Sequence, residues 1–157
     1  MCLNGCFVGS ERSAGKNIET KFGDVTVEQF DVDLARECDV VFLAVSGSFA
    51  LEHAEKIGAD GGPVVIDNSS AFRYMDHVPL VVPEINPECT KGAKLVANPN
   101  CTTAIGLMAL WPLHKLFGIK KVIMSTYQAA SGAGQEGMDE LRSGTQSVLS
   151  GERYVSC

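Results

Sequence analysis

Residues 96–104 read VANPNCTTA, and they join the end of an apolar run to the start of a helical one. The NPN at the centre is typical of a turn, because asparagine side chains bond nearby backbone and proline fixes its own φ angle. Residues 104–110 (AIGLMAL) predict a helix that Asn100 or Thr102 can cap. Cys101 therefore stands in a helix's first turn, where the dipole and unpaired backbone N–H groups favour thiolate over thiol.

Position alone leaves two interpretations of Cys101 open. A thiolate at a helix start suits a nucleophile, but most reduced cysteines in proteins are buried and inert. The six cysteines of the chain form no CxxC pair and have no histidine at zinc spacing, so we expect no structural metal. Their scattered spacing is typical of a reducing compartment such as the cytoplasm.

Upstream of this junction, apolar strands alternate with turns and a helix. Residues 40–45 (VVFLAV) and 64–67 (VVID) are continuous apolar runs, as expected for strands buried on both faces of a parallel sheet. A helix reaching about residue 57 lies between them. The alternation predicts an α/β fold with a doubly wound parallel sheet. Ligands bind such sheets beyond the carboxyl ends of the strands, where SGS at 46–48 and DNSS at 67–70 fall, although each is also a competent turn.

The flanking segments predict further elements. Alternation in residues 25–30 (VTVEQF) indicates a half-exposed strand, and prolines make residues 78–83 (VPLVVP) an extended connector. We expect the helix after Cys101 to kink or restart at Pro112. A strand is predicted at residues 121–126, followed by a last helix from about residue 135 to residue 149.

Composition excludes some classes of partner. The 157 residues are 45% hydrophobic and 20% charged, which is typical of a globular chain with a sizeable core. The net charge is −6 and no basic stripe is visible, so nucleic acid and anionic membranes are not expected as partners. No apolar run approaches membrane-spanning length.

Several polar residues can bind a substrate or cofactor. Gln128 ends the last predicted strand, where its amide can both donate and accept hydrogen bonds. Arg73 lies in a loop from which its guanidinium can hold a carboxylate or phosphate by two bonds, although loop arginines are usually solvated. Arg12 and Ser13 combine a cation and a hydroxyl in a loop of small residues that suits a phosphate.

Four segments together resemble the aspartate-semialdehyde dehydrogenases of the bacterial and plant type. They follow the family's order, and the resemblance covers nearly the whole chain. It implies a partial Rossmann-like NADP-binding domain at residues 1–101 and the start of an α+β catalytic and dimerisation domain at 102–157. The matching segments are residues 10–16 (SERSAGK), 64–86 (VVIDNSSAFRYMDHVPLVVPEIN), 97–103 (ANPNCTT) and 125–134 (STYQAASGAG).

The resemblance implies an activity. The family reduces L-aspartyl 4-phosphate with NADPH to L-aspartate 4-semialdehyde and inorganic phosphate, on the route to lysine, threonine and methionine. Cys101 matches the nucleophile that forms a thioester, which divides one hard step into two easier ones. Gln128 matches the glutamine that positions the substrate, Arg73 matches the arginine that holds its phosphate, and Asn100 is expected to contact the substrate.

The resemblance also implies a cofactor and an assembly. Arg12 and Ser13 match residues that hold the 2′-phosphate of NADPH, and Ser131 and Gly132 match a second cofactor contact near the nicotinamide. The full-length protein is expected to be a homodimer. We expect it in the cytoplasm, or in the plastid stroma if the source is a plant or alga, since a transit peptide would precede Met1.

The chain departs from the family pattern at both ends. The family's GxxGxxG turn would lie before residue 1, and its acid/base histidine would lie beyond residue 157. None of His53, His77 and His114 falls in a matching motif. We therefore expect part of a longer enzyme that has little activity alone. Two alternatives stay open: a sister reductase acting on N-acetyl-glutamyl phosphate, and a truncated, non-catalytic relative serving as an interaction module.

Overall fold

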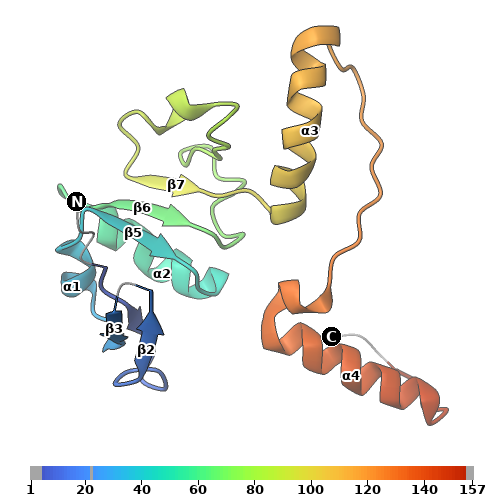
Figure 1. The fold of residues 1–157 in the computed structure, drawn as a ribbon, viewed down its shortest axis with the longest axis horizontal. Helices are drawn as coiled ribbons and strands as arrows, with labels where there is room; N and C mark the ends of the chain where they lie inside the picture. Colours follow the sequence, from blue (N-terminus) through green and yellow to red (C-terminus); the bar gives the residue numbers. More distant parts are fainter. Residues whose placement is uncertain (1–4, 22, 155–157) are drawn as a thin grey trace. The chain divides into compact units, whose positions relative to one another are not determined.

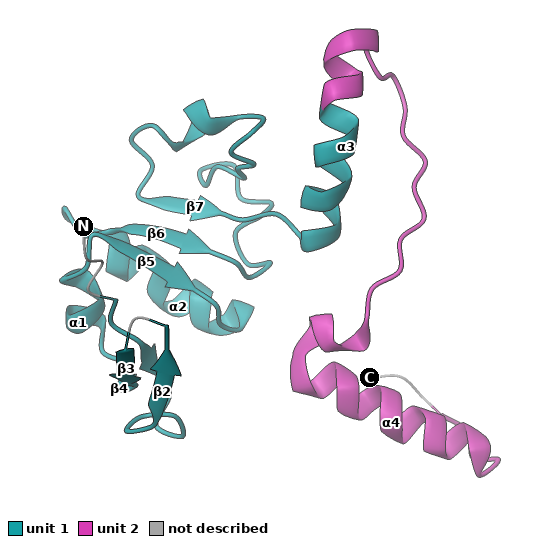
Figure 2. Cartoon of the chain, viewed as in Figure 1, with its two compact units in different colours: residues 1–111 teal, residues 112–157 magenta. Residues whose placement is uncertain are grey.

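The computed structural model describes residues 5–21 and 23–154 of the chain, so Cys2 and Cys157 lie outside the described residues. Figure 1 shows the fold, and Figure 2 shows that it divides into two compact units. Unit 1 is Met1–Trp111 and unit 2 is Pro112–Cys157. The boundary falls inside a helix, between Trp111 and Pro112.

A three-stranded parallel sheet forms the centre of unit 1. Its strands, in spatial order, are β5 (Val40–Leu43), β6 (Val64–Asp67) and β7 (Leu95–Ala97). Asp67, the last residue of β6, pairs with the last residue of each neighbouring strand, Leu43 and Ala97. Figure 1 shows the three arrows pointing the same way, so their carboxyl ends share one edge of the sheet. The predicted α/β fold with a parallel sheet is confirmed.

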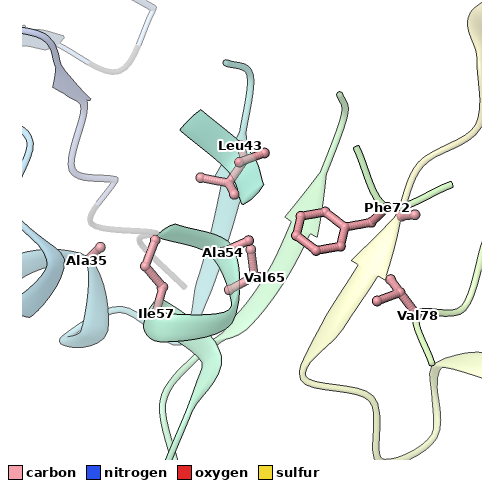
Figure 3. Packing of buried hydrophobic residues seen from close by; sticks show 9 residues of the cluster. Ala35, Leu43, Ala54, Ile57, Val65, Phe72 and Val78 are labelled. Atoms are coloured by element: carbon pink, nitrogen blue, oxygen red, sulfur yellow. The ribbon is translucent and has the colours of Figure 1, made fainter. Parts of the chain in front are cut away.

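Helix α2 (Gly47–Gly58) packs on this sheet because its inward positions are small or apolar. The Ser46 hydroxyl accepts a hydrogen bond from the Phe49 N–H at 3.4 Å and so caps the helix start. A short helix, α1 (Val32–Arg36), packs beside α2 and starts at the capping carboxylate of Asp31. Figure 3 shows side chains of the resulting core. The buried residues of this core are Ala35, Leu43, Ala50, Ala54, Ile57, Val65, Phe72, Val78 and Ala97.

The prediction that residues 40–45 are buried on both faces is wrong. Leu43 lies in the core, but Phe42, on the opposite face of β5, is 74% exposed. Helix α2 contacts β6 and β7 from the core side, and the exposure of Phe42 shows that no helix described in unit 1 covers the opposite face at this position. Among the described strands β5 pairs only with β6, so it forms an edge of the sheet.

The first strands form two small sheets. Parallel β1 and β4 make one, and the antiparallel hairpin of β2 and β3 makes the other. The predicted strand at residues 25–30 is therefore split in two at Val27. Val27 is buried. Its N–H donates a hydrogen bond to the Lys16 carbonyl and its carbonyl accepts one from the Gly15 N–H, both at 2.8 Å. The bounds are β1 Val8–Gly9, β2 Asn17–Thr20, β3 Gly23–Thr26 and β4 Glu28–Gln29.

Between β6 and β7 the chain is mostly irregular. The prolines of residues 78–83 keep this segment an extended connector, as predicted, with one isolated bridge between Leu80 and Ala97. A 3-10 turn, η1 (Pro87–Thr90), follows before β7.

Helix α3 (Cys101–Phe117) runs on through Pro112, so the alternative of a restart there is wrong. Proline removes one backbone hydrogen-bond donor from the helix. The other sixteen residues keep theirs, and the helix continues past Pro112 to Phe117. In the described part of the chain, none of the helices combines the length and apolarity needed to cross a membrane.

Unit 2 contains the end of α3, a 3-10 turn η2 (Ala130–Ala133) and helix α4 (Gly134–Leu149). The predicted last helix is thus confirmed, but the predicted strand at residues 121–126 is wrong. A strand needs a neighbouring strand to accept its backbone bonds, and the described residues of unit 2 hold none. Beyond α4, Tyr154 packs over Gly144 and its hydroxyl donates to Glu140 at 2.8 Å.

Candidate active site

The first turn of α3 holds Cys101 as its first residue, exposed at the helix start. Asn100 is the cap: its Oδ1 accepts the Thr102 N–H at 3.0 Å and also the Thr102 hydroxyl. The Asn100 carbonyl accepts the Ala104 N–H at 3.0 Å, which begins the helical hydrogen-bond series. Of the two candidate caps, Asn100 is therefore the acceptor and Thr102 is the donor. Their hydrogen bonds fix the turn that carries the thiol.

The loop after β6 is shaped by a buried carboxylate. Asp67 is fully buried, and it accepts the Ser69 N–H at 3.0 Å and the Ser69 hydroxyl at 2.7 Å. The same hydroxyl oxygen accepts the Ala71 N–H at 3.1 Å. These local bonds turn the chain at the carboxyl edge of the sheet. Arg73 lies a few residues further along this loop.

Arg73 is half-buried and joins two loops of unit 1. Its Nε donates to the Asn98 carbonyl at 2.9 Å, and its Nη2 donates to the Asn68 carbonyl at 3.0 Å. Among the described residues, nothing hydrogen-bonds to Nη1 of Arg73. Because Asn98 lies three residues before Cys101, the structure brings the predicted phosphate-binding cation to the segment that leads to the predicted nucleophile.

Arg12 and Ser13 lie in the turn that follows β1. Arg12 is exposed and has no ion pair or hydrogen bond with any described residue. The Ser13 N–H donates to the Ser10 carbonyl at 2.8 Å. Gly9 lies so close that a Cβ there would come within 3.0 Å of the Ser13 Cβ. The cation and the hydroxyl that were predicted to bind a phosphate thus lie in one turn, and this role stays a prediction.

Gln128, Ser131 and Gly132 all lie in unit 2. Gly132 is packed against the Gln128 side chain: a Cβ at Gly132 would lie 3.0 Å from Gln128 Cδ and closer still to the amide nitrogen. The Gly132 N–H donates to the Ala129 carbonyl at 2.9 Å. The predicted substrate and cofactor residues of this segment are thus brought together, and their approach to Cys101 stays a prediction.

A second exposed cysteine, Cys6, has a different environment. Its Sγ donates to Glu28 Oε1 at 3.4 Å. Partial burial of the sulfur, then the hydrogen bond and negative charge of Glu28, raise the pKa of the Cys6 thiol. Cys6 is therefore held in the less reactive thiol form at neutral pH.

The sequence interpretation missed Asn68 and Asn98. The Asn98 Nδ2 donates to the Asn68 Oδ1 at 2.8 Å, so the two side chains bridge the loops after β6 and β7. The available signal was the position of each asparagine: Asn68 directly follows the strand predicted at residues 64–67, and Asn98 comes two residues after the apolar run that ends at Val96. Pairing β6 with β7 in the order of the sequence would have placed the two side by side.

A parallel sheet whose carboxyl edge carries polar loops and helix starts defines a class, the Rossmann-like α/β domains that bind dinucleotides. Comparisons agree: residues 3–93 match the family model "Semialdehyde dehydrogenase, NAD binding domain", and residues 110–154 match "Semialdehyde dehydrogenase, dimerisation domain". The chain belongs to the semialdehyde dehydrogenase family.

Relatives carry a more specific name. Aspartate-semialdehyde dehydrogenase of Synechocystis is 42% identical over 146 residues, which are 92% of this chain and 43% of that protein. The crystal structure of aspartate semialdehyde dehydrogenase II from Vibrio cholerae, complexed with ASA, matches with a TM-score of 0.77 at 35% identity. That match covers 97% of this chain and 46% of the other. The Candida albicans enzyme with NADP matches with a TM-score of 0.56 at 25% identity, over 73% of this chain and 40% of that one. The chain thus spans less than half the length of these relatives.

Proposed function

We propose that this chain is the part of an aspartate-semialdehyde dehydrogenase that carries its nucleophile, Cys101. The observation that supports this most is the geometry of one loop: an exposed thiol begins a capped helix, and Arg73 bonds the backbone three residues upstream. The names of the relatives supply aspartate semialdehyde, and the family resemblance adds L-aspartyl 4-phosphate as the substrate proposed for the protein as a whole.

In the proposed reaction the Cys101 thiolate attacks the acyl carbon of the acyl phosphate. A carbon–sulfur bond forms, the bond from that carbon to the phosphate oxygen breaks, and inorganic phosphate leaves with the electron pair. Unpaired backbone N–H groups at the helix start stabilise negative charge placed near them, and the Cys101 sulfur stands at that position. Arg73 offers Nη1 and the second hydrogen of Nη2 to the phosphate, since its other edge is bonded to two carbonyl groups. Asn100 and Gln128 are proposed to contact the substrate.

NADPH would supply the hydride that converts the thioester to the aldehyde and returns the thiolate. In unit 1, the described residues that suit such a cofactor lie in the turn after β1. Arg12 has no partner among them and Ser13 is its neighbour, which suits a 2′-phosphate. Ser131 and Gly132 are proposed to contact the nicotinamide end. The Candida albicans relative crystallised with NADP supports this choice.

We propose that the whole protein is a homodimer of the cytoplasm, with unit 2 contributing to the subunit contact. The dimerisation-domain match covers residues 110–154, and α4 leaves Leu141, Val148 and Leu149 largely exposed. Exposed apolar side chains gathered on one helix are typical of an interface. Light scattering of the full-length protein would give the subunit number.

A chimera tests the activity without requiring the rest of the protein. This chain replaces the matching segment of the Synechocystis relative, and NADPH formation is followed with aspartate semialdehyde, phosphate and NADP⁺. We expect turnover, and Cys101→Ser should lower it by about a thousandfold or more, as removal of a nucleophile does. Cys89→Ser is the matched control, because Cys89 is also exposed but lies in η1.

Two results would favour the alternatives. Greater turnover with N-acetylglutamate semialdehyde than with aspartate semialdehyde would indicate the sister reductase. A folded, dimeric chimera without turnover would instead favour a non-catalytic module and contradict the proposal.

A further inference from the structure

Two asparagine side chains tie together the ends of neighbouring strands. Asn68 is the first residue after β6 and Asn98 is the first after β7. A hydrogen bond of 2.8 Å joins their side-chain amides. Their backbones are also held, because the Asn98 N–H donates to the Asp67 carbonyl at 2.8 Å and the Asn68 N–H donates to the Leu43 carbonyl at 3.0 Å. Both loops therefore leave the sheet at fixed positions.

The same two residues supply both acceptors of Arg73. Nε donates to the carbonyl of Asn98 and Nη2 to the carbonyl of Asn68. A guanidinium is a rigid fork, so one of its edges can bond two oxygens only when those oxygens lie at a matching separation. The hydrogen bond that Asn98 Nδ2 donates to Asn68 Oδ1 fixes that separation.

We propose that Asn68 and Asn98 are positioning residues that orient the Arg73 guanidinium toward an acyl phosphate bound at Cys101. This inference rests on the proposed function, which gives Arg73 its phosphate. With the edge formed by Nε and Nη2 bound to backbone, the edge formed by Nη1 and Nη2 faces the ligand. Neither asparagine needs to touch the substrate for this.

Protection of Cys101 by inorganic phosphate tests the inference in the 157-residue chain. Iodoacetamide alkylation of Cys101 is followed by peptide mass spectrometry over a series of phosphate concentrations. We expect Asn68→Ala and Asn98→Ala each to raise the half-protecting concentration by about three- to tenfold, the effect of losing one hydrogen bond. Arg73→Lys should raise it as well, because a lysine cannot bond both carbonyls and still grip an anion by two bonds.

A double variant separates positioning from a direct role. If the asparagines act through the guanidinium, adding Asn98→Ala to Arg73→Lys should change the half-protecting concentration by less than about twofold. Asn86→Ala is the matched control: Asn86 also joins loop segments, through Val82 N–H at 2.8 Å and Leu80 carbonyl at 3.0 Å, and should leave phosphate protection unchanged.

The outcomes are distinct. Unchanged protection in Asn68→Ala and Asn98→Ala, or a full additional effect of Asn98→Ala on top of Arg73→Lys, overturns the positioning role and leaves the proposed function standing. Absence of phosphate protection in the parent chain overturns the phosphate role of Arg73, and this inference with it.

Discussion

Removing the cap of α3 should slow the reaction of the thiol that the cap holds. Asn100→Ala deletes the oxygen that accepts both the backbone N–H and the hydroxyl of Thr102. Loss of an asparagine cap costs a helix about 1 kcal/mol. The first turn then frays, and the Cys101 sulfur loses its fixed position at the positive end of the helix dipole.

The size of the effect follows from that interaction. A charge at a helix end gains about 0.3–1 kcal/mol from the dipole, so Cys101 alkylation near neutral pH should slow by about two- to fivefold. The helix is 17 residues long, so its dipole is fully developed. Fraying of the first turn can therefore remove all of this interaction energy.

The assay is iodoacetamide labelling of the 157-residue chain, quantified separately for each cysteine peptide. Cys89 serves as the internal reference, since it is exposed and lies away from any helix of this length. Asn100→Ser is the matched variant, because serine also provides a capping oxygen and should keep most of the rate. Equal rates for the parent and Asn100→Ala, or equal losses in Asn100→Ala and Asn100→Ser, would refute the reasoning.

Three further perturbations have definite outcomes. Glu28→Gln removes a charge that raises the pKa of Cys6, so that pKa should fall and Cys6 alkylation near neutral pH should quicken, as a pH series of labelling rates would show. Ile57→Ala opens a cavity at a fully buried site and should cost about 2–5 kcal/mol in urea unfolding, whereas Leu51→Ala, at a position 52% exposed on the same helix, should cost about 0.5 kcal/mol or less. Gly132→Ala places a methyl group against the flexible end of the neighbouring glutamine, so chimera turnover should fall by about tenfold or more with little change in melting temperature; a melting temperature that falls with activity would contradict this.

Local patterns were sufficient to predict much of unit 1. The apolar run at residues 64–67 gave β6 with its observed bounds, and the NPN turn placed Cys101 at the start of a helix. These features depend on neighbours in sequence: strand propensity, proline, and a capping side chain. The helix of unit 2 was predicted for the same reason.

The failures depend on partners far away in sequence. Burial of residues 40–45 requires a helix over each face, and only the face of Leu43 has one among the described elements. The apolar run at residues 121–126 has strand propensity but no described strand beside it. Asn68 and Asn98 looked like ordinary turn residues, because only the pairing of β6 with β7 brings their amides into contact.

Helix α2 presents alanine to the sheet at two fully buried positions, Ala50 and Ala54. With no side chain beyond a methyl group, these positions let the helix backbone settle close above the strands. A valine at either one would act as a wedge, costing about 1–3 kcal/mol and lifting the helix from the sheet. Because Ser46 caps the start of that helix, the wedge would also move the turn between β5 and α2, at the sheet edge where ligands bind in this class of fold. Two methyl groups thus set how closely that turn can lie to the sheet.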